Sequence, residues 1–134
     1  MPLVRISLRE GKSEQYRRAL ADGVHQAIVE AIDAPPQDRF QIITEHPRGR
    51  LVYDPGYLGI SRTDGFVFVQ VLFSSGRTPE QKKAFYARVI ELLAGESRIR
   101  PEDVAITLVE NERSDWSFGQ GIAQYLVLPK EQWK

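Results

Sequence analysis

The sequence repeats itself at a constant offset of 65 positions, and this repeat restricts the fold more than any other feature of the chain. Gly11-Lys12-Ser13 aligns with Gly76-Arg77-Thr78, and Pro36-Gln37-Asp38 aligns with Pro101-Glu102-Asp103. The register holds without a gap from about residue 4 to about residue 45. A fixed offset over that length predicts two copies of one supersecondary unit.

The first copy has the pattern of a strand, a helix and a second strand. Apolar residues alternate with other residues over positions 3–8, which is the period of a strand. Ser13 is a candidate N-cap, and an apolar residue recurs at every fourth position over 16–32, as in an amphipathic helix. Pro35-Pro36 ends this helix, and residues 40–44 are predicted to form the second strand.

The second copy repeats the pattern with stronger local signals. Residues 66–73 are apolar at almost every position, which is typical of a strand that is buried on both faces. Thr78-Pro79-Glu80-Gln81 combines an N-cap, a proline at the first helical position and the glutamine of a capping box. Gly95 can end the helix, and residues 104–109 predict the fourth strand.

These units predict an α+β fold in a single domain that covers residues 1–134, with repeats at about 2–46 and 67–111. A strand–helix–strand crossover is right-handed and makes its two strands parallel. Two such units form a four-stranded mixed sheet with both helices on one face. The other face is left open although the third strand is apolar on both sides, so a closed homo-oligomer is expected to cover it.

The composition argues against several classes of function. The 134 residues include 18 Lys and Arg against 18 Asp and Glu, and this formal net charge of zero argues against a nucleic-acid partner. The chain has no Cys and two His, which argues against thiolate catalysis and a metal site. No apolar run is long enough for a membrane helix, so a cytoplasmic location without membrane contact is expected. Gly119-Gln120-Gly121 follows no strand–helix pattern, so no cofactor is expected.

The topology brings three distant segments to one edge of the sheet. If the two inner strands are antiparallel, the start of the first lies beside the end of the second, while the strand that begins at Phe40 starts at the same edge. This edge is predicted to gather an amine, a carboxylate, two hydroxyls and a guanidinium, from Pro2, Asp38, Ser74, Ser75 and Arg77.

Pro2 has two interpretations. Methionine is normally removed before a small residue, and removal of Met1 would leave Pro2 as a free secondary amine. Such an amine can act as a general acid, a general base or a nucleophile toward carbonyls. If Met1 is retained, the Pro2 nitrogen is an amide and Pro2 only opens an edge strand.

Asp38 and Arg77 also have a structural explanation beside the functional one. Arg77 could hold a substrate carboxylate, yet Lys12 occupies the equivalent place in the first copy, as expected for a solvated cation before a helix. Asp38 could orient or activate water, yet Asp103 recurs at the same place in the second copy and fits a turn before a strand.

The segment after the repeat, residues 111–134, is predicted to be mostly a connector, like residues 47–65. Trp116 and Phe118 could wall an apolar pocket, and they equally fit a protein core. Residues 122–128 are predicted as a short strand that could pair with a neighbouring subunit. His25, on the flank of the first helix, is expected to be packed or partly exposed.

Four separated segments, in this order and spacing, resemble the tautomerase superfamily and its malonate semialdehyde decarboxylase branch: MPLVRISL, HQAIVEAIDAPPQDRFQII, YLGISRTDGFVFVQVLFSSGRT and DWSFGQGIAQYL. The resemblance implies a homotrimer of duplicated β-α-β subunits and an amino-terminal proline, here Pro2, as the catalytic residue. It also implies catalytic roles for Asp38 and Arg77. The implied substrate contacts are Phe73, Ser75, Arg77, Trp116 and Phe118. Some members have a second arginine where this chain has Ser75, so binding of a dicarboxylate is less expected here.

The resemblance implies two reactions on small oxo or enol carboxylic acids, and they need opposite protonation states of one amine. Tautomerisation of an enolic 2-oxo acid needs a neutral Pro2 as the base, with Arg77 on the carboxylate. Decarboxylation of a 3-oxo acid, or hydration of an acetylenic acid, needs a cationic Pro2 while Asp38 activates water or keeps the amine charged. A Schiff base on Pro2 is a variant of the decarboxylation. The residues alone leave two further alternatives, a non-catalytic oligomeric scaffold and a cofactor-free αβ oxygenase.

Overall fold

The computed structural model describes residues 2–133, and the prediction about removal of Met1 concerns a residue outside this range. Six main elements follow the predicted order: β1 (Leu3–Arg9), α1 (Glu14–Ala31), β2 (Phe40–His46), β3 (Val67–Ser74), α2 (Pro79–Gly95) and β4 (Val104–Asn111). The strands form one sheet in the order β2-β1-β3-β4. The β1/β2 and β3/β4 pairs are parallel and the central β1/β3 pair is antiparallel, which confirms the predicted mixed sheet.

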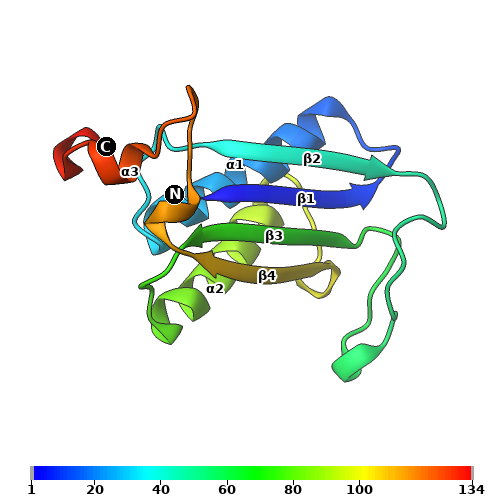
Figure 1. Cartoon of the computed structure of the whole chain (residues 1–134). Coiled ribbons are helices and arrows are strands. Elements are labelled where there is room, and N and C mark those ends of the chain that lie inside the picture. The colour runs from blue at the N-terminus through cyan, green and yellow to red at the C-terminus, as the bar shows by residue number, and fades with distance from the viewer. Residues whose placement is uncertain (1, 134) are drawn as a thin grey trace.

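The two long helices begin where the sequence predicts, because their first turns are capped. The Ser13 hydroxyl accepts a hydrogen bond from the Tyr16 backbone N–H at 3.0 Å. Thr78 and Gln81 form a complete capping box, in which each side chain accepts from the backbone N–H of the other residue. Both helices lie on the same face of the sheet (Figure 1).

The core lies between this helical layer and the sheet. Alternate residues of β1 and β3 point toward the helices and are almost fully buried, which is the burial pattern expected of strands with one covered face. They meet the apolar stripes of α1 and α2, and the largest fully buried side chains include Ile6, Val69, Phe73, Leu20 and Phe85. Neither long helix covers the opposite face of the sheet; the C-terminal segment reaches it only at the end where Phe118 contacts Phe40, and several apolar side chains of this face are exposed (Figure 1).

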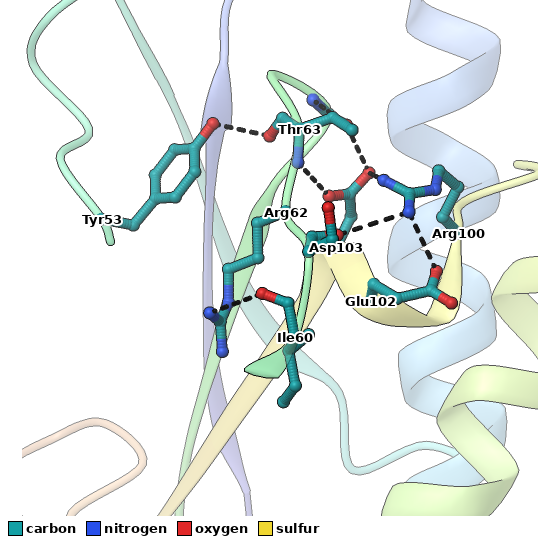
Figure 2. Close-up of polar contacts among 9 residues, drawn as sticks. Tyr53, Ile60, Arg62, Thr63, Arg100, Glu102 and Asp103 are labelled. Carbon is teal, nitrogen blue, oxygen red and sulfur yellow. Dashed lines mark hydrogen bonds and ion pairs between the residues drawn. The ribbon is translucent and has the colours of Figure 1, made fainter. Parts of the chain in front are cut away.

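The linker between the repeats, residues 47–65, has little regular structure, but the buried carboxylate of Asp103 fixes it to the second repeat. The Asp103 carboxylate accepts hydrogen bonds from the Thr63 backbone N–H at 2.7 Å and from its hydroxyl at 2.6 Å, and it lies 3.7 Å from Arg100 (Figure 2). The Tyr53 hydroxyl donates to the Thr63 carbonyl oxygen at 2.5 Å. Arg62 donates to three carbonyl oxygens within the linker.

The predicted strand over residues 122–128 is wrong, because this segment contains the short helix α3 (Gln124–Val127). The Gln124 side chain accepts from the Phe118 backbone N–H at 2.9 Å and donates to the Gly119 carbonyl oxygen at 2.8 Å. The Leu128 N–H bonds to the Gln124 carbonyl oxygen at 2.8 Å. The segment thus satisfies its backbone locally and does not join the edge of the sheet. Among residues 2–133, no helix is both long and apolar enough to cross a membrane.

Candidate active site

The start of β1, the end of β3 and the turn before β2 lie at the same edge of the sheet, where the C-terminal segment also returns (Figure 1). Leu3 pairs with Phe40 of β2 on one side and with Leu72 of β3 on the other. Pro2, which is buried, therefore enters the sheet between the segments that carry Asp38 and Arg77.

Asp38 lies in a turn that is held by backbone and histidine contacts. The Asp38 N–H donates to the Pro35 carbonyl oxygen at 3.0 Å, and His25 Nε2 lies 2.9 Å from the Pro36 carbonyl oxygen. Burial raises the pKa of the Asp38 carboxyl above its ordinary value, while electrostatic interactions with His25 and Arg77 act in the opposite direction. The carboxyl is thus partly desolvated, and the Arg77 guanidinium partly offsets this effect.

Arg77 is held in place by three hydrogen bonds. Its Nε and Nη2 donate to the Ile32 carbonyl oxygen at 3.2 and 3.1 Å, and Nη1 donates to the Ser74 carbonyl oxygen at 2.9 Å. The guanidinium carbon lies 5.7 Å from the centre of the Phe73 ring. Arg77 therefore caps the C-terminal end of α1, and its guanidinium is fixed at the edge of the sheet.

The aromatic residues after β4 form a stacked wall. The Trp116 and Phe118 rings are 5.6 Å apart and nearly parallel, and Trp116 Nε1 donates to Asn111 Oδ1 at 2.8 Å. Phe118 also contacts Phe40 and Tyr125, with ring centres 6.0 and 5.1 Å apart. A cavity of about 270 Å³, lined by Asp38, Phe40, Phe118, Tyr125 and other residues, adjoins this wall. We call it the apolar cavity.

A second cavity of about 390 Å³ lies on the Arg77 side of the same edge. Pro35, Tyr125 and Trp133 line both cavities, so the two form adjoining parts of one site. The second is additionally lined by Asp33, Ser74, Arg77, Arg113 and Lys130. Because three of these five side chains are cationic, we call it the cationic cavity.

Tyr125 is a site residue that the sequence analysis missed. Burial and the charge of Asp38 raise its pKa to about 12, while Arg77 and Arg113 act to lower it. Its hydroxyl is therefore un-ionised at neutral pH and lies within the fields of all three charged groups. Tyr125 was not predicted as a site residue because residues 122–128 were assigned to a strand. Its place in the segment DWSFGQGIAQYL, which resembles the family, is the signal that could have identified it.

The structure separates some predicted site residues from the two cavities. Phe73 and Trp116 are not among the residues that line either cavity: Phe73 is buried in the core beside Arg77, and Trp116 stacks on Phe118. The Ser75 hydroxyl donates to Glu112 Oε1 at 3.1 Å, so it links the ends of β3 and β4. Within residues 2–133, no group of three or more His, Cys, Asp or Glu residues could hold a metal ion.

Comparisons with known proteins identify the family of the chain. Two family models, both described as tautomerase enzyme, match residues 38–119 and 2–59. Two probable tautomerases of Bacillus subtilis (strain 168) are similar over most of their length. YusQ is 40% identical over 126 residues, which is 94% of this chain and 99% of the relative. YrdN is 41% identical over 127 residues, which is 95% of this chain and 98% of the relative.

Solved structures of the same superfamily are also similar to this chain. Malonate semialdehyde decarboxylase, described with decarboxylase and hydratase activities, has a TM-score of 0.88 at 35% identity, covering 92% of this chain and 95% of that one. FG41 malonate semialdehyde decarboxylase inhibited by 3-bromopropiolate has a TM-score of 0.88 at 40% identity, covering 95% and 99%. Native fused 4-OT, at 22% identity and a TM-score of 0.74, shares the fold. These matches set aside the scaffold and oxygenase alternatives: the chain is an enzyme of the tautomerase superfamily, in the branch of malonate semialdehyde decarboxylase.

Proposed function

We propose that this enzyme decarboxylates small 3-oxo carboxylic acids, with the amine of Pro2 as the catalytic group after removal of Met1. The observation that carries the proposal is the position of buried Pro2 between the segments of Asp38 and Arg77. The similarity to two malonate semialdehyde decarboxylases, at 35% and 40% identity, supports the same reaction class.

In the proposed reaction the Pro2 amine is cationic. Its N–H hydrogen-bonds the 3-oxo group of the substrate, and the bond between the carboxylate carbon and the adjacent carbon breaks. The electron pair of that bond forms a carbon–carbon double bond while the carbonyl electron pair moves to the 3-oxo oxygen, carbon dioxide leaves, and the Pro2 ammonium transfers its proton to this oxygen, which gives an enol and a neutral amine. The amine takes the O–H proton back as a proton from water adds to the carbon that carried the carboxylate, which gives the aldehyde or ketone. Asp38 favours the cationic amine because an adjacent carboxylate raises the pKa of an amine.

Arg77 is proposed to orient the substrate by its carboxylate. Its hydrogen bonds to the Ile32 and Ser74 carbonyl oxygens fix the guanidinium before the substrate arrives, so little side-chain entropy is lost on binding. Phe118 lines the apolar cavity and Trp116 stacks on it, so this aromatic wall is proposed to limit the contact of a bound substrate with water and thereby to strengthen charge interactions at the site.

Tautomerisation of an enolic 2-oxo acid is the second candidate, favoured by the two Bacillus relatives named as probable tautomerases. It needs a neutral Pro2 amine at the working pH. Titration of the isotopically labelled amine by nuclear magnetic resonance separates the two reactions. An amine pKa well above neutral supports the decarboxylase, and a value well below neutral supports the tautomerase.

Pro2→Ala tests the amine directly. Loss of a positioned acid or base typically reduces turnover by about 10²–10⁴-fold, so we expect a loss of this size with a 3-oxo acid while the fold, followed by circular dichroism, is unchanged. Intact mass must show that Met1 is absent from both proteins. Unchanged turnover in Pro2→Ala, or retention of Met1 in the active enzyme, would contradict the proposal.

We also propose that the active form is a homotrimer. Exposed apolar side chains on the open face of the sheet support it, as does the description of several related structures as fused 4-OT trimers.

A further inference from the structure

The cationic cavity contains a second arginine that neither the sequence repeat nor the proposed reaction requires. Ser75 occupies the place where some relatives have an additional arginine, which made a dicarboxylate ligand unexpected. Arg113 reaches the same region from a different segment. It follows β4, whose last residue Asn111 pairs with Ser74 in the parallel β3/β4 register.

The ends of β3 and β4 are tied together, and this tie places Arg113 on the Arg77 side of the site. The Ser75 N–H donates to the Asn111 carbonyl oxygen at 2.8 Å, and the Ser75 hydroxyl donates to Glu112 at 3.1 Å. The next residue is Arg113, whose guanidinium carbon lies 4.8 Å from the centre of the Trp133 ring. This ring lines both cavities, so Arg113 is held at their junction.

The charges around the cationic cavity are suited to an anion with more than one negative charge. Arg77, Arg113 and Lys130 line it, opposed by the carboxylate of Asp33. The fields of Arg77 and Arg113 both act on the Tyr125 hydroxyl, which is shared by the two cavities. The two arginines are therefore close to one point of the site. Paired charges of this kind favour planar carboxylates, which a guanidinium binds through two parallel hydrogen bonds.

Ser74 adds a neutral donor to the same cavity. Ser74 is only 6% exposed, and its buried side-chain oxygen makes no hydrogen bond within residues 2–133. A buried hydroxyl without a partner is unfavourable and is uncommon in folded proteins. Rotation of this side chain toward a carboxylate held by Arg77, which already donates to the Ser74 carbonyl oxygen, would supply the missing acceptor.

We propose that Arg113 is a second carboxylate-binding residue, and that this enzyme binds ligands with two carboxylates in preference to those with one. One carboxylate lies at Arg77 and Ser74, and the other lies at Arg113. This inference rests on the proposed placement of the substrate carboxylate at Arg77, but it does not depend on the reaction or on the Pro2 amine.

Binding of unreactive acids tests the proposal without catalysis. Glutarate carries two carboxylates, and its monoamide has nearly the same shape with one. Charge-assisted hydrogen bonds are worth enough for the wild-type enzyme to bind glutarate about tenfold more tightly than the monoamide by titration calorimetry. Equal affinities would overturn the proposal with no variant involved.

Arg113→Gln assigns the effect to one residue. It should reduce the affinity for glutarate about tenfold and leave the monoamide unchanged, while Arg113→Lys restores part of the loss. Arg50→Gln is the matched control, because it removes one exposed positive charge from the linker. The control should retain the wild-type preference. A preference for glutarate that persists in Arg113→Gln, or is lost equally in Arg50→Gln, would overturn the assignment.

Failure of the inference and failure of the proposed function are distinguishable. If Pro2→Ala still turns over a 3-oxo acid, the proposed function fails while the glutarate preference stands. If turnover depends on Pro2 but glutarate and its monoamide bind equally, only the role of Arg113 fails.

Discussion

Two aspartates occupy the same position of the repeat, and their surroundings give them different tasks. Asp103 is 3% exposed, and its carboxylate is occupied by Thr63 and Arg100 at the end of the sheet where β4 begins. Asp38 is half-buried at the opposite end and lines the apolar cavity. Duplication thus supplied two carboxylates in equivalent turns. Asp38 lines the apolar cavity and is proposed to act in catalysis, whereas Asp103 fixes the linker.

Asp38→Asn should reduce activity and stabilise the fold at the same time. Burial raises the pKa of this carboxyl, so its ionised form is disfavoured in the folded chain relative to the unfolded chain. The resulting destabilisation is fully present above the folded-state pKa and disappears as the pH falls below the unfolded value of about 4. We therefore expect Asp38→Asn to melt at a higher temperature than the wild type at pH 8, with the difference vanishing near pH 3.

The same variant should turn over a 3-oxo acid about 10²-fold more slowly if Asp38 keeps the Pro2 amine charged or activates water. Thermal melts at both pH values and steady-state kinetics at pH 8 check the two expectations. A lower melting temperature than wild type at pH 8 would show that Asp38 acts mainly as a structural turn residue.

The sequence predicted the gathering of Pro2, Asp38 and Arg77 because strand direction alone determines which ends of strands share an edge. It could not predict the hydrogen bonds of Arg77 to Ile32 and Ser74, since these join residues that are far apart in the chain. Tyr125 and Arg113 were missed for a related reason. They belong to the segment after the repeat, which has no second copy for comparison.

The helices and strands that could be predicted are those whose signals lie within one short stretch of sequence. The alternation in β1, the periodicity of α1 and the capping box of α2 each lie within one short stretch, and each matches the structure. The segment at residues 122–128 has no such signal, because a short apolar run fits a strand or a helical turn equally well. Its conformation is determined by contacts of Gln124 with Phe118 and Gly119.

The linker shows how one buried carboxylate can order a long irregular segment. The Asp103 carboxylate accepts two short hydrogen bonds and attracts the Arg100 guanidinium. Asp103→Asn replaces it with a neutral amide, which is a weaker acceptor and loses the attraction to the Arg100 charge. Leaving such a buried group poorly paired typically costs about 1–3 kcal/mol, so we expect a loss of this size in the free energy of unfolding.

Activity should be nearly unchanged in Asp103→Asn at temperatures where the variant is folded, because Asp103 lies at the far end of the sheet from Pro2. Urea unfolding and steady-state kinetics measure the two effects. Thr63→Val is a partial control that removes one of the two hydrogen bonds to Asp103, together with the 3.2 Å bond from the Gly65 N–H to the Thr63 hydroxyl, and leaves the Asp103 carboxylate with its Thr63 N–H and Arg100 partners; it should give a smaller loss of stability. Loss of activity without loss of stability in Asp103→Asn would contradict this role.

At the level of the whole molecule, the two long helices leave one face of the sheet open. The strand register places Leu3 between Phe40 and Leu72 on this face, and Val109 follows Leu72 on β4. A second row contains Phe68 next to Ser7. The exposed fractions of Phe40, Phe68 and Val109 are 46%, 39% and 42%. Apolar side chains gathered in this way on one face favour association.

Phe68→Asp should therefore dissociate the proposed trimer. Phe68 lies on β3, one of the two central strands, so any copy that covers the open face would bury the rest of its ring, which is 39% exposed; this contributes roughly 1 kcal/mol in each subunit, a part of the value for a fully exposed ring. A buried, unpaired carboxylate in its place is strongly unfavourable. We expect sedimentation velocity to show a trimer for the wild type and a monomer for Phe68→Asp. Val52→Asp is the control, since Val52 is 85% exposed on the linker, and it should remain a trimer. A monomeric wild type at micromolar concentration, or a trimeric Phe68→Asp, would show that this face is not the interface.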